Sequence, residues 1–513
     1  MSSALVAIAF SGVATYVFLW ALLHLTQDDK EPPTVSNSIP FFSPLLGMVR
    51  WSMDFYSSMR KRYHNLPIYT LRIPGTRIYV INSLELIPVV QRQWRTLIFA
   101  PIQVKAAQAA MGVSKDSIAI MERDMVTESG FVNGMVKATH HTTSHGPALD
   151  ALNAKAFETF DNALKGPDAP TTISMFAWID KQIMRATTDA VYGPSNPMQD
   201  TSNLEDWHKY HPALMFLMLD IFPQNIFFRT AIQSRDNLIK SFVKYYEDGS
   251  YKQGSAYIQQ FTKHCIDQKI PEIDIPRLIL GTVFNNVANT SPSAFWVIYH
   301  IFSDPVVLQE CRDEVKQAVQ NDPDGTSTIH LSFILNSCPI LLSTYHEVFR
   351  YHGMANSVRV VSEDHVLDNK YLLKKGGLVM LSARVQHKNP AVWGENVNEF
   401  YHKRFMKQQN GGKRINAVAF RGFGGGTTLC PGRHFATSEI LLLATLLLLR
   451  FDVQPANGMP WVLPSTAKSS QAEAMEQPDD DIDIKLIPRP EASGRTWRVA
   501  FSGQRETELL EQK

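Results

Sequence analysis

The segment FGGGTTLCPGRHFATSEI, residues 423–440, decides how the rest of this sequence is interpreted. Its three consecutive glycines allow a tight turn and a close approach of the backbone to a ligand. The turn leads into Cys430, and a helix-like segment begins just after Pro431 and Gly432. Free N–H groups and the dipole at a helix N-terminus favour a thiolate. Cys430 is therefore a candidate structural thiol, redox group, zinc ligand, nucleophile or haem ligand.

The other cysteines and the flanking residues separate these alternatives. Cys265, Cys311 and Cys338 lie far from Cys430 and form no C-x-x-C pair, so neither zinc-ligand spacing nor a disulfide framework is present. A phosphate-binding loop would carry a lysine after the glycines, and none follows. A thiol nucleophile would need a base, for which His434 is a candidate by sequence alone. An axial haem ligand needs a hydrogen-bonded thiolate, which this loop can supply.

Composition and the N-terminus bound the class of protein. The chain has 513 residues, 44% hydrophobic and 19% charged, which is typical of a globular protein, and its net charge of +1 gives no field that would favour nucleic acid. Residues 1–27 carry no charged side chain and include an apolar run long enough to cross a bilayer. A cleaved signal peptide is the alternative, but no basic residue precedes the apolar run. We therefore expect a transmembrane signal anchor, and the few cysteines favour a body in the cytosol.

The body is expected to be one large, mainly α domain with small β-sheets. A proline-rich hinge, residues 28–50, separates the anchor from this domain, residues 51–513. Helical patterns dominate from about 85 to 350, and the apolar helix after Cys430 is too short to span a membrane, so a buried core helix is predicted there. Strand-like segments, including a hairpin around PGT in the first, are predicted at 66–82, 356–383 and 481–490.

The cysteine loop resembles the haem-binding signature of the cytochrome P450 family, F-x-x-G-x-x-x-C-x-G. Phe423, Gly426, Cys430 and Gly432 match it. The resemblance implies the cytochrome P450 fold and haem b, with Cys430 as the axial iron ligand and Phe423 beside the ring. The family usually has Arg or His two residues before the cysteine, where it binds a haem propionate, and this chain has Thr428. The propionates must therefore be neutralised by another group.

Further motifs support the resemblance. Glu347 and Arg350 form a Glu-x-x-Arg pair that matches the family's structural motif, with Arg404 of the later meander as the third member. The usual Pro and Glu beside Arg404 are replaced here by other residues. Arg359 matches a basic strand residue that contacts a haem propionate, and Arg433 is a second candidate for haem binding. The family's Trp-x-x-x-Arg is absent around residues 130–160, where several histidines stand that could serve the propionates or lie exposed: His140, His141 and His145.

A long helix, residues 282–302, contains the candidate oxygen-binding groove. Pro292 lacks an N–H and is expected to kink this helix. Thr290, beside the kink, would hydrogen-bond dioxygen and help to deliver protons. The family usually has an acid before this threonine, but here Asn289 cannot ionise, so protons must arrive through water or another group. The alternative is a kinked core helix in which Ser and Thr bond back to the backbone.

The segments ANTSPSAFW and CPGRHFA narrow the resemblance to the branch of bile-acid sterol hydroxylases and prostacyclin synthase, with fungal biosynthetic relatives. The resemblance implies a monooxygenase that uses O2 and electrons from NADPH, delivered by NADPH–cytochrome P450 reductase, at the endoplasmic reticulum membrane. A hydrophobic steroid- or terpenoid-like substrate is expected. The alternatives are an isomerase or dehydratase that acts on a peroxide without a reductase, and a haem-binding carrier or sensor without turnover.

Two surface features are predicted. A basic segment without Asp or Glu spans residues 401–433 and is expected to dock an acidic reductase, although a solvated loop is the alternative. An apolar segment at 214–228, interrupted by Asp220 and Pro223, either dips into the membrane or packs in the core. The basic segment contains Lys403, Arg404, Lys407, Lys413, Arg414, Arg421 and Arg433.

Overall fold

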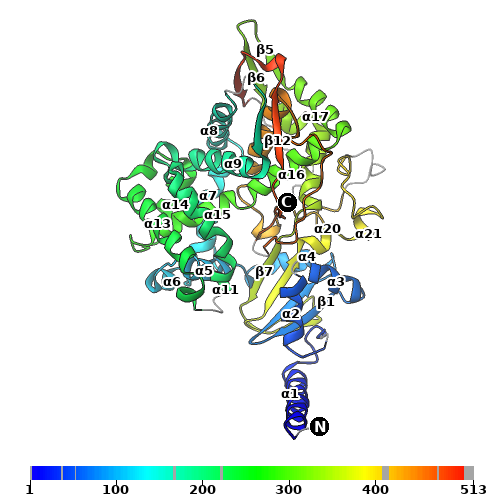
Figure 1. The fold of residues 1–513 in the computed structure, drawn as a ribbon. Helices are drawn as coiled ribbons and strands as arrows, with labels where there is room; N and C mark the ends of the chain where they lie inside the picture. Colours follow the sequence, from blue (N-terminus) through cyan, green and yellow to red (C-terminus); the bar gives the residue numbers. More distant parts are fainter. Residues whose placement is uncertain are drawn as a thin grey trace.

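The computed structural model describes residues 3–35, 38–51, 54–165, 169–219, 223–406, 415–470 and 473–501. Figure 1 shows one mainly helical body with small sheets, from which the first helix projects. The predicted fold class, mainly α with small β-sheets in a single large domain, is confirmed.

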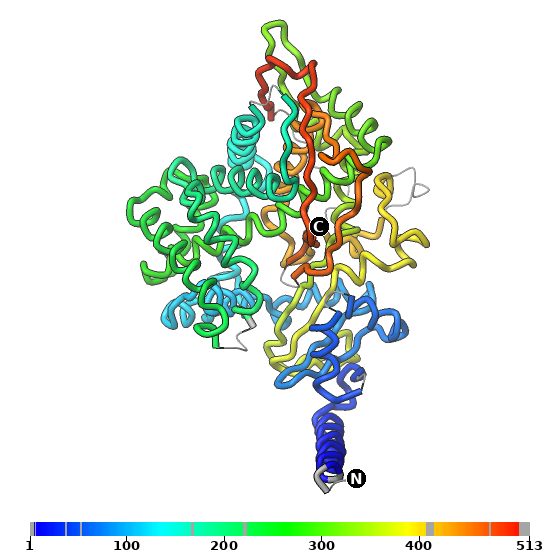
Figure 2. Tube along the Cα trace, viewed as in Figure 1, coloured from blue at the N-terminus to red at the C-terminus, as the bar shows by residue number. Residues whose placement is uncertain are grey.

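The projecting helix α1, Ser3–Thr26, is the described helix that is long and apolar enough to cross a membrane. Only 6% of its most apolar window is buried in the protein, and it stands clear of the body in Figure 2. Its C-terminal end is held by two arginines of the body. Arg72 donates to the Thr26 hydroxyl at 3.0 Å, and Arg77 donates to the Thr26 carbonyl at 2.9 Å.

The largest sheet joins distant parts of the chain. The predicted hairpin is confirmed, because β1 and β2 pair antiparallel around Gly75, whose φ of 78° suits glycine. β10 then pairs parallel to β2, and β7 pairs antiparallel to β10. This order places Arg359, on β7, opposite Val379. The strands, in the order β1-β2-β10-β7-β3, are Ile68–Ile73, Thr76–Ile81, Leu378–Ser382, Asn356–Val361 and Leu97–Ile98.

Three smaller sheets complete the strands. The predicted strand within residues 481–490 is β12, which pairs with the strand that follows the core helix and with a strand before α9. The sheets are β11-β12-β4 (Phe451–Pro455, Asp483–Pro488, Thr171–Ser174), β13-β6-β5 (Thr496–Ala500, Thr326–His330, Val319–Asn321) and β8-β9 (His365–Leu367, Tyr371–Leu373).

Helices build the remainder of the body around the sheets. The lobe on the left of Figure 1 contains α5, α6, α7, α11, α13, α14 and α15, and α17, α20 and α21 lie on the opposite side. Their bounds are: α2 Phe42–Trp51, α3 Asp54–Arg62, α4 Leu86–Arg92, α5 Ala100–Ala109, α6 Lys115–Met121, α7 Phe131–Thr143, α8 Pro147–Leu164, α9 Met175–Tyr192, α10 Thr201–Tyr210, α11 Leu214–Leu219, α12 Gln224–Phe227, α13 Arg229–Glu247, α14 Ala256–Asp267, α17 Pro305–Gln317, α18 Leu331–Ser337, α19 Pro339–Tyr351, α20 Ala383–His387 and α21 Pro390–Trp393.

The core centres on α16, Thr290–Phe302, and α22, Arg433–Arg450. All residues of α16 are buried, and it packs against α22, α9 and α19. The predicted buried helix after the cysteine is confirmed, since the side chains from Ser438 to Leu448 of α22 are buried. These two helices bring the predicted oxygen groove and the cysteine loop together.

The central helix differs from the prediction of one kinked helix over 282–302. It is interrupted at Ala288 and Asn289, between α15, Ile275–Val287, and α16. Pro292 has no N–H to donate to the carbonyl of Ala288, so the hydrogen-bond ladder cannot continue there. The result is a break four residues before the proline rather than a smooth bend.

Candidate active site

The cysteine loop is held by its own backbone. The N–H of Cys430 donates to the carbonyl of Phe423 at 2.9 Å, and the N–H of Leu429 donates to that of Gly426 at 3.1 Å. Gly424 and Gly426 have φ values of 81° and 60°, in the left-handed region that favours glycine. This turn fixes Cys430 three residues before the start of α22.

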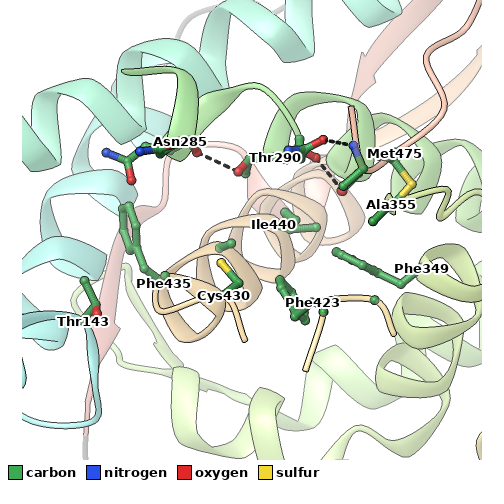
Figure 3. Close-up of a pocket in the computed structure, with 18 of the residues that line it drawn as sticks. Thr143, Asn285, Thr290, Phe349, Ala355, Phe423, Cys430, Phe435, Ile440 and Met475 are labelled. Atoms are coloured by element: carbon green, nitrogen blue, oxygen red, sulfur yellow. Dashed lines mark hydrogen bonds between the residues drawn. The ribbon is translucent and has the colours of Figure 1, made fainter. Parts of the chain in front are cut away.

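Cys430 and Thr290 line one cavity of about 370 Å³ from opposite sides, as Figure 3 shows. The cysteine comes from the loop before α22, and the threonine from the first residue of α16. Apolar side chains form most of the walls between them. They include Phe349, Phe423, Phe435, Ile440 and Met475.

The surroundings of Cys430 act on its thiol in opposite directions. Burial raises the pKa of Cys430, whereas the hydrogen bond from the N–H of Gly432 and the charge of Arg433 lower it. Burial is the largest of these effects, so the pKa of Cys430 is raised in the protein without haem. The sequence had predicted that the helix N-terminus would favour the thiolate, and burial outweighs that effect. Binding of a metal ion would deprotonate the coordinating thiol.

The break between α15 and α16 arranges the polar side of the cavity. The hydroxyl of Thr290 donates to the carbonyl of Asn286 at 2.9 Å, and that of Ser293 donates to the carbonyl of Asn289 at 2.6 Å. The side-chain oxygen of Asn289 accepts a 2.6 Å hydrogen bond from the N–H of Ala474. Asn289 therefore ties the C-terminal loop to the central helix, a role that its sequence position did not indicate.

The Glu-x-x-Arg pair forms a buried ion cluster away from the cavity. Arg350 donates two hydrogen bonds of 2.7 Å to Glu347, and Arg404 donates to both carboxylate oxygens of Glu347 at 3.0 and 3.1 Å. Arg350 also donates to the carbonyls of His387, Val397 and Glu399. The cluster thus joins α19 to the meander and carries no exposed reactive group.

Arg359 and Arg433 approach the cysteine loop from two elements. Arg359, on β7, is 1% exposed and donates to the hydroxyls of Thr427 at 3.4 Å and Thr428 at 3.2 Å. Arg433, at the start of α22, donates to the carbonyl of Cys430 at 3.3 Å. Arg359 therefore contacts the threonine that stands where the family has a basic residue.

The predicted basic docking segment is largely internal or neutralised where the structure describes it. Arg421 is 2% exposed and Arg404 is 6% exposed, so neither can contribute to a docking surface. Lys403 forms an ion pair of 2.5 Å with Glu310. Three further basic residues of this segment lie outside the described residues: Lys407, Lys413 and Arg414. The reason is that the described residues around Arg404 and Arg421 fold inward rather than over the surface.

The three histidines predicted as possible propionate partners differ in exposure. His140 and His141 are exposed, while the half-buried ring of His145 lies 4.2 Å from that of His434. Burial and the neighbouring charge of Arg433 lower the pKa of His434 to about 3, which leaves it a neutral side chain rather than a base near neutral pH.

In the 214–228 segment, Leu214 and Leu217 are buried in the core but Phe216, Ile226 and Phe227 are exposed; Asp220 lies outside the described residues.

The comparisons with known proteins agree with this site. The family model "Cytochrome P450" matches residues 32–473, so the chain belongs to the cytochrome P450 family. It is 30% identical to the cytochrome P450 monooxygenase nodJ of Hypoxylon pulicicidum, over 92% of each chain. It is 25% identical to the cytochrome P450 7B1 of Mus musculus, over 96% of this chain and 97% of that protein. It is 26% identical to the 25-hydroxycholesterol 7-alpha-hydroxylase of Rattus norvegicus, over 68% of this chain and 86% of that protein. The chain is thus a monooxygenase of the haem-thiolate class.

The residues present fit the haem of this family. Gly432 lines the cavity, and a Cβ on it would meet no atom within 4 Å, so the glycine borders open space beside Cys430. The cysteine provides the single soft ligand that haem iron takes in this class. The buried Nε of Arg359 has no hydrogen-bond partner in the described protein, which suits a site for a carboxylate group. Phe423 and Phe435 supply flat apolar surfaces for the macrocycle.

Proposed function

We propose that this protein hydroxylates or otherwise oxidises a hydrophobic, steroid- or terpenoid-like small molecule. It would do so with O2 and with electrons from NADPH through NADPH–cytochrome P450 reductase. The observation that carries the proposal is that Thr290 and Cys430 line one apolar-walled cavity from opposite sides. A thiol for iron and a hydroxyl for proton transfer are the two groups that oxygen activation requires.

Haem bound at Cys430 would supply the activation of dioxygen and the oxidation of a C–H bond. The chain's own residues would bind and orient the substrate. Phe349, Phe435 and Met475 would exclude water from the reacting centre, which strengthens the remaining polar contacts. Thr290 would hold a proton on Oγ1 for delivery into the cavity. Asn289 cannot ionise, so water or another group must bring the proton to Thr290.

The proposed substrate class rests on the cavity and on a relative. The cavity walls are mainly apolar, with a polar strip from the central helix that includes Asn285, Asn289 and Thr290. Such a site favours a hydrophobe with one or two hydrogen-bonding groups. The relative from Rattus norvegicus is named for the oxidation of 25-hydroxycholesterol, a molecule of this kind.

We place the protein on the endoplasmic reticulum membrane, with α1 as a single anchor and the catalytic body in the cytosol. Exposed apolar side chains on α2 and α12 support a membrane-facing surface. Large apolar side chains that are exposed on a soluble protein are usually scattered singly, whereas these are grouped on two helices. Helix α2 lies at the end of the body from which α1 projects (Figure 1). The side chains are Phe42, Leu46, Val49, Trp51, Ile226 and Phe227.

The experiment is an incubation of the anchored protein with reductase, NADPH, isotopically heavy dioxygen and a lipophilic-metabolite extract, analysed by mass spectrometry. A product that gains one heavy oxygen and depends on NADPH would support the proposal. Thr290→Ala should lower product formed per NADPH consumed, whereas Thr15→Ala, in α1, should not. An unlabelled product formed without NADPH would instead indicate an isomerase or dehydratase. Binding of metabolites without any turnover would indicate a carrier or sensor.

A further inference from the structure

Two buried guanidinium groups lie beside the cysteine loop. Arg359 is on β7, and Arg421 stands two residues before Phe423, directly ahead of the glycine-rich turn. Their exposed fractions are 1% and 2%. The backbone of Arg421 is fixed on both sides, since its N–H donates to Nε2 of His387 at 2.9 Å and its carbonyl accepts from the N–H of Gly424 at 3.2 Å.

Neither arginine forms an ion pair with a described carboxylate. Within the described part of the chain, the Arg359 guanidinium donates to the two threonine hydroxyls named above, and its Nε is buried without a hydrogen-bond partner. Both terminal nitrogens of Arg421, Nη1 and Nη2, are buried without a hydrogen-bond partner among the residues that the structure describes. Burial lowers the pKa of each arginine to about 10, and the charge of Arg359 contributes to the lowering at Arg421. The nearby residues 407–414, outside the described range, contain no Asp or Glu in their sequence.

This arrangement contrasts with three other arginines of the same protein, two of them buried and one largely buried, which each pair with a carboxylate. Arg350 and Arg404 share the carboxylate of Glu347, and Arg450 forms a 2.8 Å ion pair with Asp161. A buried charge without a partner is strongly unfavourable, and two like charges near each other are more so. A pair of buried guanidinium groups without a carboxylate partner in the described protein, beside a ligand cavity, therefore indicates that the ligand brings the negative charge.

We propose that Arg421, together with Arg359, binds a haem propionate and replaces the basic residue that the family usually has at the position of Thr428. Thr428 lines the cavity with Cys430, and its hydroxyl accepts from Arg359, which places Arg359 at the edge of the haem site. Gly422, the residue after Arg421, lines the same cavity, so Arg421 adjoins this site as well. Arg421 belongs to the irregular segment before the loop instead of to the loop itself, and it lies close enough to Arg359 for that charge to act on it. The inference rests on haem binding alone and is independent of the substrate and the reductase proposed above.

The first test measures haem loss from the purified holoprotein to excess apomyoglobin, followed by absorbance. Arg421→Met should release haem about tenfold faster or more, because it removes a charge-assisted partner of the propionate. Arg421→Lys keeps the charge but loses the planar fork, so an intermediate rate is expected. Arg498→Met, at an exposed arginine, is the matched control and should match the parent protein. An unchanged rate in Arg421→Met would overturn the proposal.

The second test removes the charge from the ligand instead of the protein. The parent protein and Arg421→Lys are reconstituted with haem and with haem dimethyl ester, whose propionates are neutral. The parent should retain haem much longer than the ester, and the preference should shrink in Arg421→Lys and shrink further in Arg421→Met where that variant folds, with Arg359 accounting for what remains. Equal retention of both ligands by the parent would overturn the proposal even if every arginine variant failed to fold. Turnover is not measured, so the substrate proposal is tested separately.

Discussion

The side-chain oxygen of Asn289 lies 2.6 Å from the backbone nitrogen of Ala474, which donates a hydrogen bond to it. The two residues come from the break in the central helix and from the C-terminal loop, and both line the cavity. The residue that occupies the place of the family's acid therefore shapes the cavity. Its amide holds a loop that contributes Met475 to the cavity wall.

Asn289→Ala is expected to weaken substrate binding by about 1 kcal/mol, since it removes this hydrogen bond and frees the loop. Asn289→Asp should preserve substrate affinity, because a carboxylate can accept the same hydrogen bond. It should also change the fraction of NADPH converted to product, because it places an ionisable group beside Thr290. Binding titrations and coupling measurements check both variants. Equal affinity in Asn289→Ala and the parent would contradict this role, and Asn336→Ala, at an exposed asparagine, is the control.

Glu347→Gln is expected to destabilise the fold by about 3–5 kcal/mol, because it leaves two buried arginines without a carboxylate. Denaturant unfolding of the holoprotein measures the change. Glu310→Gln is a matched control, since Glu310 pairs with Lys403 and His402 near the surface and should cost less than about 1 kcal/mol. Similar losses in both variants would show that burial does not determine the cost.

Gly426→Ala is expected to lower the stability of the fold, whereas Gly432→Ala is expected to lower the haem content. A Cβ on Gly426 would lie 2.9 Å from Cγ of Gln91, and its φ of 60° disfavours alanine, so a stability loss of about 1–2 kcal/mol is expected. A Cβ on Gly432 meets no protein atom within 4 Å and should leave folding intact. It would occupy space beside Cys430, so the haem content should fall. Unfolding and haem absorbance, measured on both variants, separate the two effects.

The elements that depend on a short stretch of sequence were the ones that could be predicted. The hairpin at 66–82 has its own turn residues, and the core helix after Cys430 has a continuous apolar run, so both were predictable. The break at Ala288 was not, because a proline can either bend or interrupt a helix and the surrounding packing decides which.

The environment of charged residues was the harder part to predict. Arg421 stands in a segment rich in lysine and arginine, so the sequence suggested an exposed surface. Its burial follows from contacts with β7 and with His387, which are distant in the chain. The clue available in the sequence was its position directly ahead of the cysteine loop. Composition alone cannot distinguish a docking surface from a site that awaits an anionic ligand.

Glu439 gives a prediction about pH. This residue of α22 is 1% exposed, lines the cavity and accepts a 2.7 Å hydrogen bond from Thr187. Burial raises the pKa of Glu439 to about 8 from an ordinary value of 4.5, although the hydrogen bond from Thr187 opposes the shift. The folded protein therefore binds a proton here that the unfolded chain releases, so stability should fall as pH rises from about 4.5 to about 8.

Glu439→Gln keeps the hydrogen bond and removes the titration, so it should flatten the loss of stability across this pH window. Unfolding free energies of the parent and the variant, measured at intervals from pH 5 to pH 8, test this as the difference between the two curves. The variant should gain on the parent as pH rises. Glu205→Gln, at an exposed glutamate, should run parallel to the parent. A constant difference between Glu439→Gln and the parent would mean that Glu439 ionises in the folded protein as it does in the unfolded chain.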